Sequence, residues 1–131
     1  MKLYILILAT LVFAVGCTAT PEKHLTQEPV EISGPELDEY WVLENNQLSF
    51  RTGNVDEPTE PGVVTVRYLI DSNGRVFERE IVESTPARMW DKFALNAMQA
   101  ASYRPAASNP NSTPVYVTVD FEFRNPLQET R

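Results

Sequence analysis

Nine residues near the C-terminus alternate without a break between apolar and polar side chains. The apolar positions are Val115, Val117, Val119, Phe121 and Phe123, and the positions between them are Tyr116, Thr118, Asp120 and Glu122. A strict two-residue period predicts a β-strand with one face in a core and the other toward solvent. Such a strand is stable only when neighbouring strands pair with it and a second layer covers its apolar face.

A β-hairpin is predicted earlier in the chain. Val64–Ile70 alternates in the same way, and Asp71-Ser72-Asn73-Gly74 follows with a glycine where a positive φ is expected. The return segment, Arg75–Glu83, departs from strict alternation. This departure predicts a bulge or an edge position for the second strand of the hairpin.

A helix is predicted after Pro86. Apolar residues recur on one helical face, with charged and amide side chains on the other; the apolar set is Trp90, Phe93, Ala94, Ala97, Met98 and Ala101. The order hairpin, helix, strand predicts an α+β two-layer sandwich, with a three-stranded antiparallel sheet and the helix packed on one face. A right-handed crossover places the last strand beside the first, at the edge of the sheet. We assign residues 62–125 to this domain and residues 126–131 to a tail.

The N-terminus carries the pattern of an export signal. Met1-Lys2 precedes thirteen uncharged residues, Leu3–Val15, which are too few for a membrane-spanning helix of about 20 residues. The run Phe13-Ala14-Val15-Gly16-Cys17 resembles the lipobox of bacterial lipoproteins. The resemblance implies a signal peptide over residues 1–16, lipidation of Cys17, and, with Thr18 next, attachment to the outer membrane facing the periplasm. An uncleaved apolar anchor and simple secretion with a free thiol are the alternatives.

Residues 17–61 are acidic and punctuated by prolines, which predicts a tether. Fully extended it would reach about 150 Å, and about 35 to 40 Å on average if flexible. Within residues 36–51, Tyr40 and Trp41 are large adjacent aromatic side chains that need to pack against other apolar groups. Both a hairpin with its turn at the asparagines and a short helix after Pro35 fit this segment.

Composition excludes several classes of function. The formal net charge of −7 argues against nucleic-acid partners. The single cysteine rules out an internal disulfide, and the single histidine, His24, has no neighbours to complete a metal site, so neither a metal nor a cofactor is expected. Enzyme chemistry is disfavoured because His24 lies in the tether and Ser84, Ser102 and Ser108 have no base in a recognisable pattern. Glu78 and Glu80 are expected to be solvated.

The residues from Pro61 to Arg124 resemble the C-terminal domain of the TonB family. The resemblance is carried, in order, by Gly62-x-Val64-x-Val66, Ile70-Asp71-x-Asn73-Gly74-Arg75-Val76, Val82-Glu83-Ser84, an alanine-rich helix, Ser102-Tyr103-Arg104-Pro105-Ala106 and the alternating last strand. It implies a periplasmic interaction module, not an enzyme, that binds an extended transporter peptide as an added strand. We expect the partner at the last strand, through Val115, Tyr116, Val117, Thr118, Val119, Asp120, Phe121 and Glu122.

Two departures from the family pattern limit this expectation. The chain lacks the uncleaved inner-membrane helix and long proline-rich linker of the energy transducers, and Phe50-Arg51 stands where the family has a Tyr-Pro element. We therefore predict a non-enzymatic periplasmic lipoprotein that binds an envelope protein or transporter peptide by strand addition. The alternatives are a structural envelope protein that self-associates as a homodimer or contacts peptidoglycan, and an atypical TonB-type energy transducer.

Overall fold

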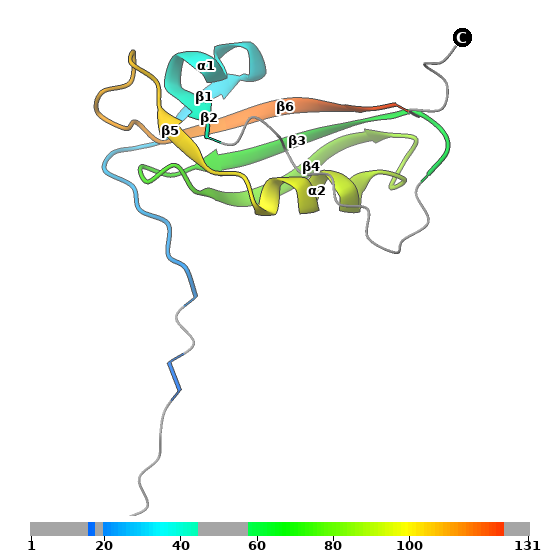
Figure 1. The fold of residues 1–131 in the computed structure, drawn as a ribbon, viewed down its shortest axis with the longest axis horizontal. Helices are drawn as coiled ribbons and strands as arrows, with labels where there is room; N and C mark the ends of the chain where they lie inside the picture. The colour runs from blue at the N-terminus through cyan, green and yellow to red at the C-terminus, as the bar shows by residue number, and fades with distance from the viewer. Residues whose placement is uncertain (1–15, 18–19, 45–57, 125–131) are drawn as a thin grey trace, which may run out of the picture.

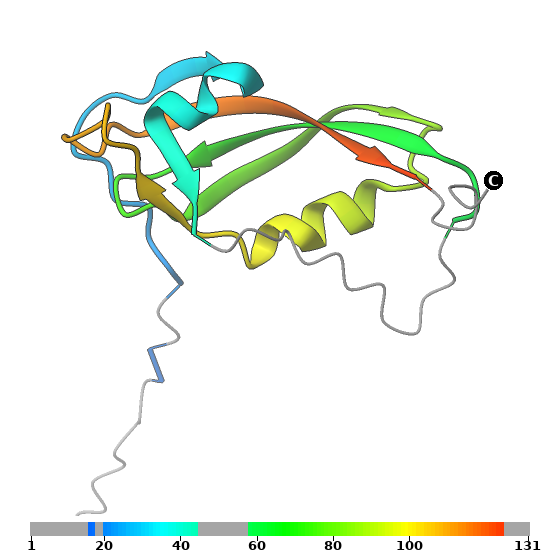
Figure 2. The same cartoon turned by 45° about the horizontal axis from the view of Figure 1, so that its top comes forward.

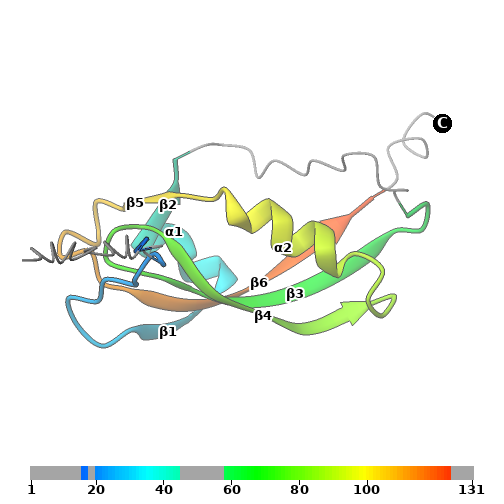
Figure 3. The same cartoon turned by 90° about the horizontal axis from the view of Figure 1, so that it is seen from below.

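The computed structural model describes residues 16–17, 20–44 and 58–124. Its main sheet has four strands in the order β1-β6-β3-β4, and a second sheet consists of β2 and β5. Helix α2 (Asp91–Gln99) covers one face of the main sheet (Figures 1 and 3). The described residues contain no helix long and apolar enough to cross a membrane.

The predicted hairpin, helix and last strand are present. β3 (Gly62–Ile70) pairs antiparallel with β4 (Val76–Thr85) on one side and with β6 (Val115–Phe123) on the other. Most residues of β3 and β6 that the alternation assigns to the core are buried, including Val64, Val66, Val115 and Val117, whereas Val119 is half-buried. On α2 the buried residues are Ala94, Ala97 and Met98, so the helix presents its predicted apolar face to the sheet.

The turn between β3 and β4 depends on Gly74. Its φ is +78°, and a Cβ there would collide with the carbonyl oxygen of Tyr103. The N–H of Gly74 donates to the carbonyl of Asp71 (2.9 Å), and its own carbonyl accepts from Tyr103 (2.9 Å). The expected positive φ is confirmed, and a close approach of β5 (Tyr103–Pro105) adds a second reason for glycine.

The return strand is irregular, as its sequence indicates. The register between β3 and β4 shifts twice, between Thr65 and Val66 and between Arg67 and Leu69. At the second irregularity Glu78 has a positive φ of 49°. β4 therefore has both predicted features, bulges and an edge position.

The prediction of three strands was wrong, because a fourth strand comes from the segment assigned to the tether. β1 (Val30–Ser33) pairs in parallel with Val115–Thr118 of β6. The last strand is therefore an inner strand over its first half, and an edge only beyond Thr118. In Figure 2 the orange-red strand β6 continues beyond the end of the blue strand β1, toward the C-terminus of the chain.

Residues after β1 also pack on the domain. A 3₁₀ turn (Gly34–Glu36) leads into α1 (Leu37–Tyr40) and then into β2 (Trp41–Leu43), which pairs with β5. Trp41 is 1% exposed, and its indole N–H donates to the carbonyl of Thr113 (2.9 Å). The short-helix alternative thus matches residues 37–40, whereas the second half of the alternative hairpin lies outside the described residues.

Residues ahead of β1 run along the β3–β4 turn. The backbone N–H of His24 donates to the Asp71 carboxylate (2.9 Å), and its carbonyl accepts from the N–H of Ser72 (2.8 Å). Thr26 donates its N–H to the Ser72 hydroxyl (3.0 Å). The described part of the expected tether is therefore attached to the domain from residue 24 onward.

Candidate functional site

The main sheet has two edges, and β4 forms one of them. Two bulges interrupt its backbone, and it carries exposed charged side chains at Arg79, Glu80 and Glu83, with Val82 57% exposed. Bulges and charges are the usual means by which proteins prevent pairing at an edge strand. The β4 edge is therefore a poor template for another strand.

The other edge is formed by β1 and, beyond the end of β1, by the second half of β6. The N–H of Val30 in β1 donates to the carbonyl of Pro114 (3.0 Å), so that carbonyl points away from β3. β6 pairs with β3 without a register shift, and backbone groups alternate in direction along a strand. The N–H and C=O groups of Asp120 and Glu122 therefore point outward, and no described strand pairs with them.

The eight residues predicted to bind a partner divide into two groups. β1 lies against Val115, Tyr116, Val117 and Thr118. Val119, Asp120, Phe121 and Glu122 lie beyond β1, with the side chains of Asp120 and Glu122 exposed on the face opposite α2. The edge assignment was wrong for the first group, because β1 pairs with these residues. β1 has only four residues and one buried side chain, Ile32, so its sequence contains no strand pattern that would predict it.

A small apolar hollow adjoins the accessible part of β6. It has a volume of about 160 Å³ and is lined by side chains of α1, β2, β3, β5 and β6, namely Leu37, Asp38, Trp41, Leu43, Tyr68, Tyr103, Val119 and Phe121. The sequence did not predict this hollow. The sequence did contain one signal, the cluster of Leu37, Tyr40 and Trp41. These apolar side chains must pack against other residues, but the sequence does not indicate which part of the fold they contact.

Ion pairs hold the N-terminal segment on the face of the sheet opposite α2. Arg67 binds the Glu31 carboxylate through two hydrogen bonds of 2.8 Å, and its guanidinium lies 4.1 Å from the centre of the Tyr116 ring. Lys23 pairs with Glu78 (2.5 Å), which also accepts the hydroxyl of Tyr116. The hydrogen bond from Arg67 lowers the pKa of Glu31, and that from Lys23 lowers the pKa of Glu78.

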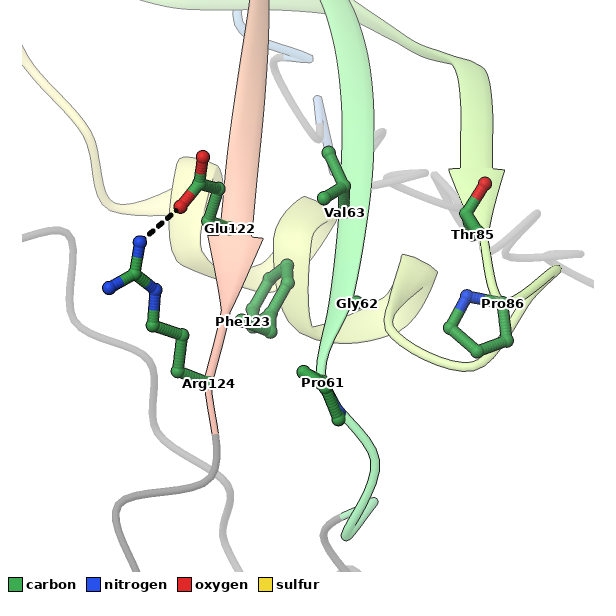
Figure 4. Close-up of a pocket in the computed structure, with 8 residues that line it drawn as sticks. All are labelled: Pro61, Gly62, Val63, Thr85, Pro86, Glu122, Phe123 and Arg124. Atoms are coloured by element: carbon green, nitrogen blue, oxygen red, sulfur yellow. Dashed lines mark hydrogen bonds and ion pairs between the residues drawn. The ribbon is translucent and has the colours of Figure 1, made fainter. Parts of the chain in front are cut away.

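A larger hollow of about 390 Å³ lies where β4 and β6 end and β3 begins (Figure 4). It is lined by Pro61, Gly62, Val63, Thr85, Pro86, Glu122, Phe123 and Arg124. Glu122 and Arg124 form an ion pair across one side of it (2.7 Å). Phe123 lines the hollow, and its ring stacks on that of Trp90 with the centroids 4.6 Å apart.

The residues considered as metal ligands or nucleophiles can be located where the structure describes them. The described residues contain no cluster of three or more potential metal ligands among histidine, cysteine, aspartate and glutamate. The serines considered from the sequence make structural contacts: Ser84 accepts from the N–H of Arg88, Ser102 donates to Glu44, and Ser108 donates to the carbonyl of Glu39. Within the described ranges, the outward backbone groups of Asp120 and Glu122 have no strand paired with them.

Comparisons with known proteins give one family. Residues 56–124 match the family model described as the Gram-negative bacterial TonB protein C-terminal. The solution structure of the Pseudomonas aeruginosa TonB C-terminal domain is similar, with 24% sequence identity and a TM-score of 0.49, covering 70% of this chain and 91% of that one. No curated protein matches. Since the family match spans more than half of the 131 residues, the chain belongs to the TonB C-terminal family.

Proposed function

We propose that the chain is a non-enzymatic envelope lipoprotein that binds an extended peptide by adding it as a strand to β6 at Val119–Glu122. The observation that carries the proposal is the outward direction of the Asp120 and Glu122 backbone groups on an unbulged strand. The opposite edge is interrupted by two bulges. Strand addition needs regularly spaced donors and acceptors, which β6 supplies and β4 does not.

Membership of the TonB C-terminal family favours a periplasmic partner, either an envelope protein or a peptide of an outer-membrane transporter. The proposed attachment is a lipid on Cys17, the chain's only cysteine, which is exposed. Two or three acyl chains would hold the protein stably at the membrane surface. We place it at the periplasmic face of the outer membrane.

The available edge is short, which limits the affinity that the backbone can provide. Four hydrogen bonds contribute about 0.5 to 1.5 kcal/mol each, whereas micromolar binding requires about 8 kcal/mol. Side chains must therefore supply much of the binding free energy. The apolar hollow beside Val119 and Phe121 is the nearest surface that can do so.

The proposal is tested by changing one backbone group. In Asp120→Pro the outward N–H is lost, while the bonds of the odd-numbered residues to β3 remain; Asp120→Ala changes only the side chain and is the matched control. A photoreactive residue replacing Glu122 would be crosslinked in an envelope extract and its products identified by mass spectrometry. We expect one envelope protein, crosslinked through an extended segment, to be captured with Asp120→Ala and lost with Asp120→Pro.

Two results would overturn the proposal. Capture that is unaffected by Asp120→Pro would mean that the partner does not use the edge. Capture of copies of this chain alone would favour the alternative, a structural protein that self-associates through its edge strands. Circular dichroism and a urea titration of each variant establish that the domain remains folded.

A further inference from the structure

We propose that the β6 edge selects peptides in which apolar residues alternate with lysine or arginine. This inference rests on the proposed strand addition and specifies the peptide that it favours. It follows from the two faces of the accessible edge, which differ in chemistry. An added strand places successive side chains on opposite faces of the sheet, next to those of its neighbour.

On the α2 face, the incoming side chain meets the apolar hollow. Val119 and Phe121 of β6 form one wall, and Leu37 and Trp41 form part of the other. The volume of about 160 Å³ is close to that of cavities that accommodate a benzene ring. The hollow therefore has room for one aliphatic or aromatic side chain of the peptide.

On the opposite face, the incoming side chains lie beside carboxylates. Asp120 is exposed and accepts a hydrogen bond from the Thr65 hydroxyl (2.6 Å), but forms no ion pair within the described ranges. The Glu122 side chain is 61% exposed and pairs with Arg124. Opposite charges on neighbouring strands attract, and like charges repel.

The same sign of charge continues onto the wall of the hollow. Asp38 is one of its lining residues, and the first turn of α1 contains Asp38 and Glu39. The chain as a whole carries a formal net charge of −7. An acidic peptide would therefore meet repulsion along the edge, whereas a basic one would be attracted to it.

Three synthetic peptides test the selection against the protein of residues 18–131. They are Ac-Lys-Ile-Lys-Ile-Lys-NH₂, the same peptide with glutamate in place of lysine, and the lysine peptide with N-methyl groups on alternate backbone nitrogens. Calorimetry at low and physiological salt gives their affinities. We expect the lysine peptide to bind at least tenfold more tightly than the glutamate peptide, and N-methylation on the edge-facing nitrogens to abolish binding.

Variants of the protein separate local selection from general attraction to an acidic chain. Asp120→Asn should reduce the preference for lysine at least threefold, whereas Glu83→Gln, which removes one charge from the β4 edge, should leave it unchanged. Leu37→Trp should fill the hollow and weaken binding of the lysine peptide. Equal effects of Asp120→Asn and Glu83→Gln would overturn the inference.

The outcomes also distinguish this inference from the proposed function. If both peptides bind equally and N-methylation abolishes binding, strand addition stands and the selection is wrong. If no peptide binds, or N-methylation has no effect, both are wrong. Chemical shifts of the β6 amides in ¹⁵N spectra report whether binding is at this edge.

Discussion

Asp71 connects two parts of the chain that are far apart in sequence. This fully buried side chain accepts hydrogen bonds from the N–H groups of Asn73 and Arg75 in the turn, and from His24. The sequence predicted the turn from Asp71 and Gly74, but could not indicate that the second carboxylate oxygen binds the N-terminal segment. A hydrogen bond to a backbone N–H 47 residues away leaves no pattern in the sequence.

We predict that Asp71→Ala lowers the free energy of unfolding by about 2 to 4 kcal/mol, because three backbone donors lose a buried acceptor. Asn73→Ala, which alters an exposed side chain in the same turn, should cost less than about 0.5 kcal/mol. Urea titrations of both variants measure the difference. A change below 0.5 kcal/mol for Asp71→Ala would show that these bonds do not contribute to stability.

At the scale of elements, the amount of local pattern decided what the sequence could predict. β3 and β6 each have nine residues and α2 has nine, enough for several repeats of a period. β1 has four residues, of which only Ile32 is buried, so no period exists to detect. Its parallel pairing with β6 is a long-range contact that the sequence does not reveal. The predicted edge was Val115–Phe123, whereas in the structure only the part of β6 beyond Thr118 is accessible.

Whether the rest of the domain stays folded without β1 can be tested with Ile32→Asp, which places a charge at a position that is 6% exposed. We expect β1 to detach while the rest of the domain stays folded. Amide hydrogen exchange should then accelerate at Tyr116 and Thr118, whose N–H groups point toward β1, and remain slow at Val117, which points toward β3.

Val30→Asp is the matched control for this experiment, because Val30 is already 40% exposed and should tolerate the charge. Faster exchange at every β6 amide, including Val117, would contradict the prediction. It would mean that the domain needs β1 to fold.

Tyr68 and Tyr103 join the two sheets. Their hydroxyls are 2.9 Å apart, and burial, followed by the proximity of Tyr103, raises the pKa of Tyr68 far above its usual value near 10. Above pH 10 the unfolded chain loses this proton while the folded protein keeps it. The free energy of unfolding should therefore fall as pH rises, by up to about 1.4 kcal/mol per pH unit for this group.

Tyr68→Phe removes this contribution, so we expect its stability to fall less steeply than that of the wild type above pH 10. Burial also raises the pKa of Tyr103, so some dependence on pH should remain. Chemical denaturation at pH 9, 10 and 11 gives the slopes. Parallel slopes for the two proteins would refute the contribution of Tyr68.

For the whole molecule, attachment of the N-terminal segment changes the distance over which the protein can act. Composition predicted a tether through residue 61, yet backbone hydrogen bonds attach His24 to the β3–β4 turn. Only seven peptide steps separate Cys17 from His24. At full extension they span roughly 25 Å, compared with about 150 Å for the longer tether.

The proposed lipid on Cys17 would therefore hold the domain next to the membrane, and a partner peptide would have to reach it there. Cys17 is the chain's only cysteine, so residues 17–131 can be coupled through it to maleimide lipids in vesicles. We expect strong energy transfer from Trp41 and Trp90 to dansyl-labelled headgroups.

Inserting 20 Gly/Ser residues after Thr20 should reduce this transfer substantially, because the flexible insert lengthens the link between the coupled lipid and the domain. The same insert after Arg124 leaves that link unchanged and should have no effect. Equal transfer in all three proteins would mean that the domain contacts the membrane through its own surface and does not depend on the length of the segment.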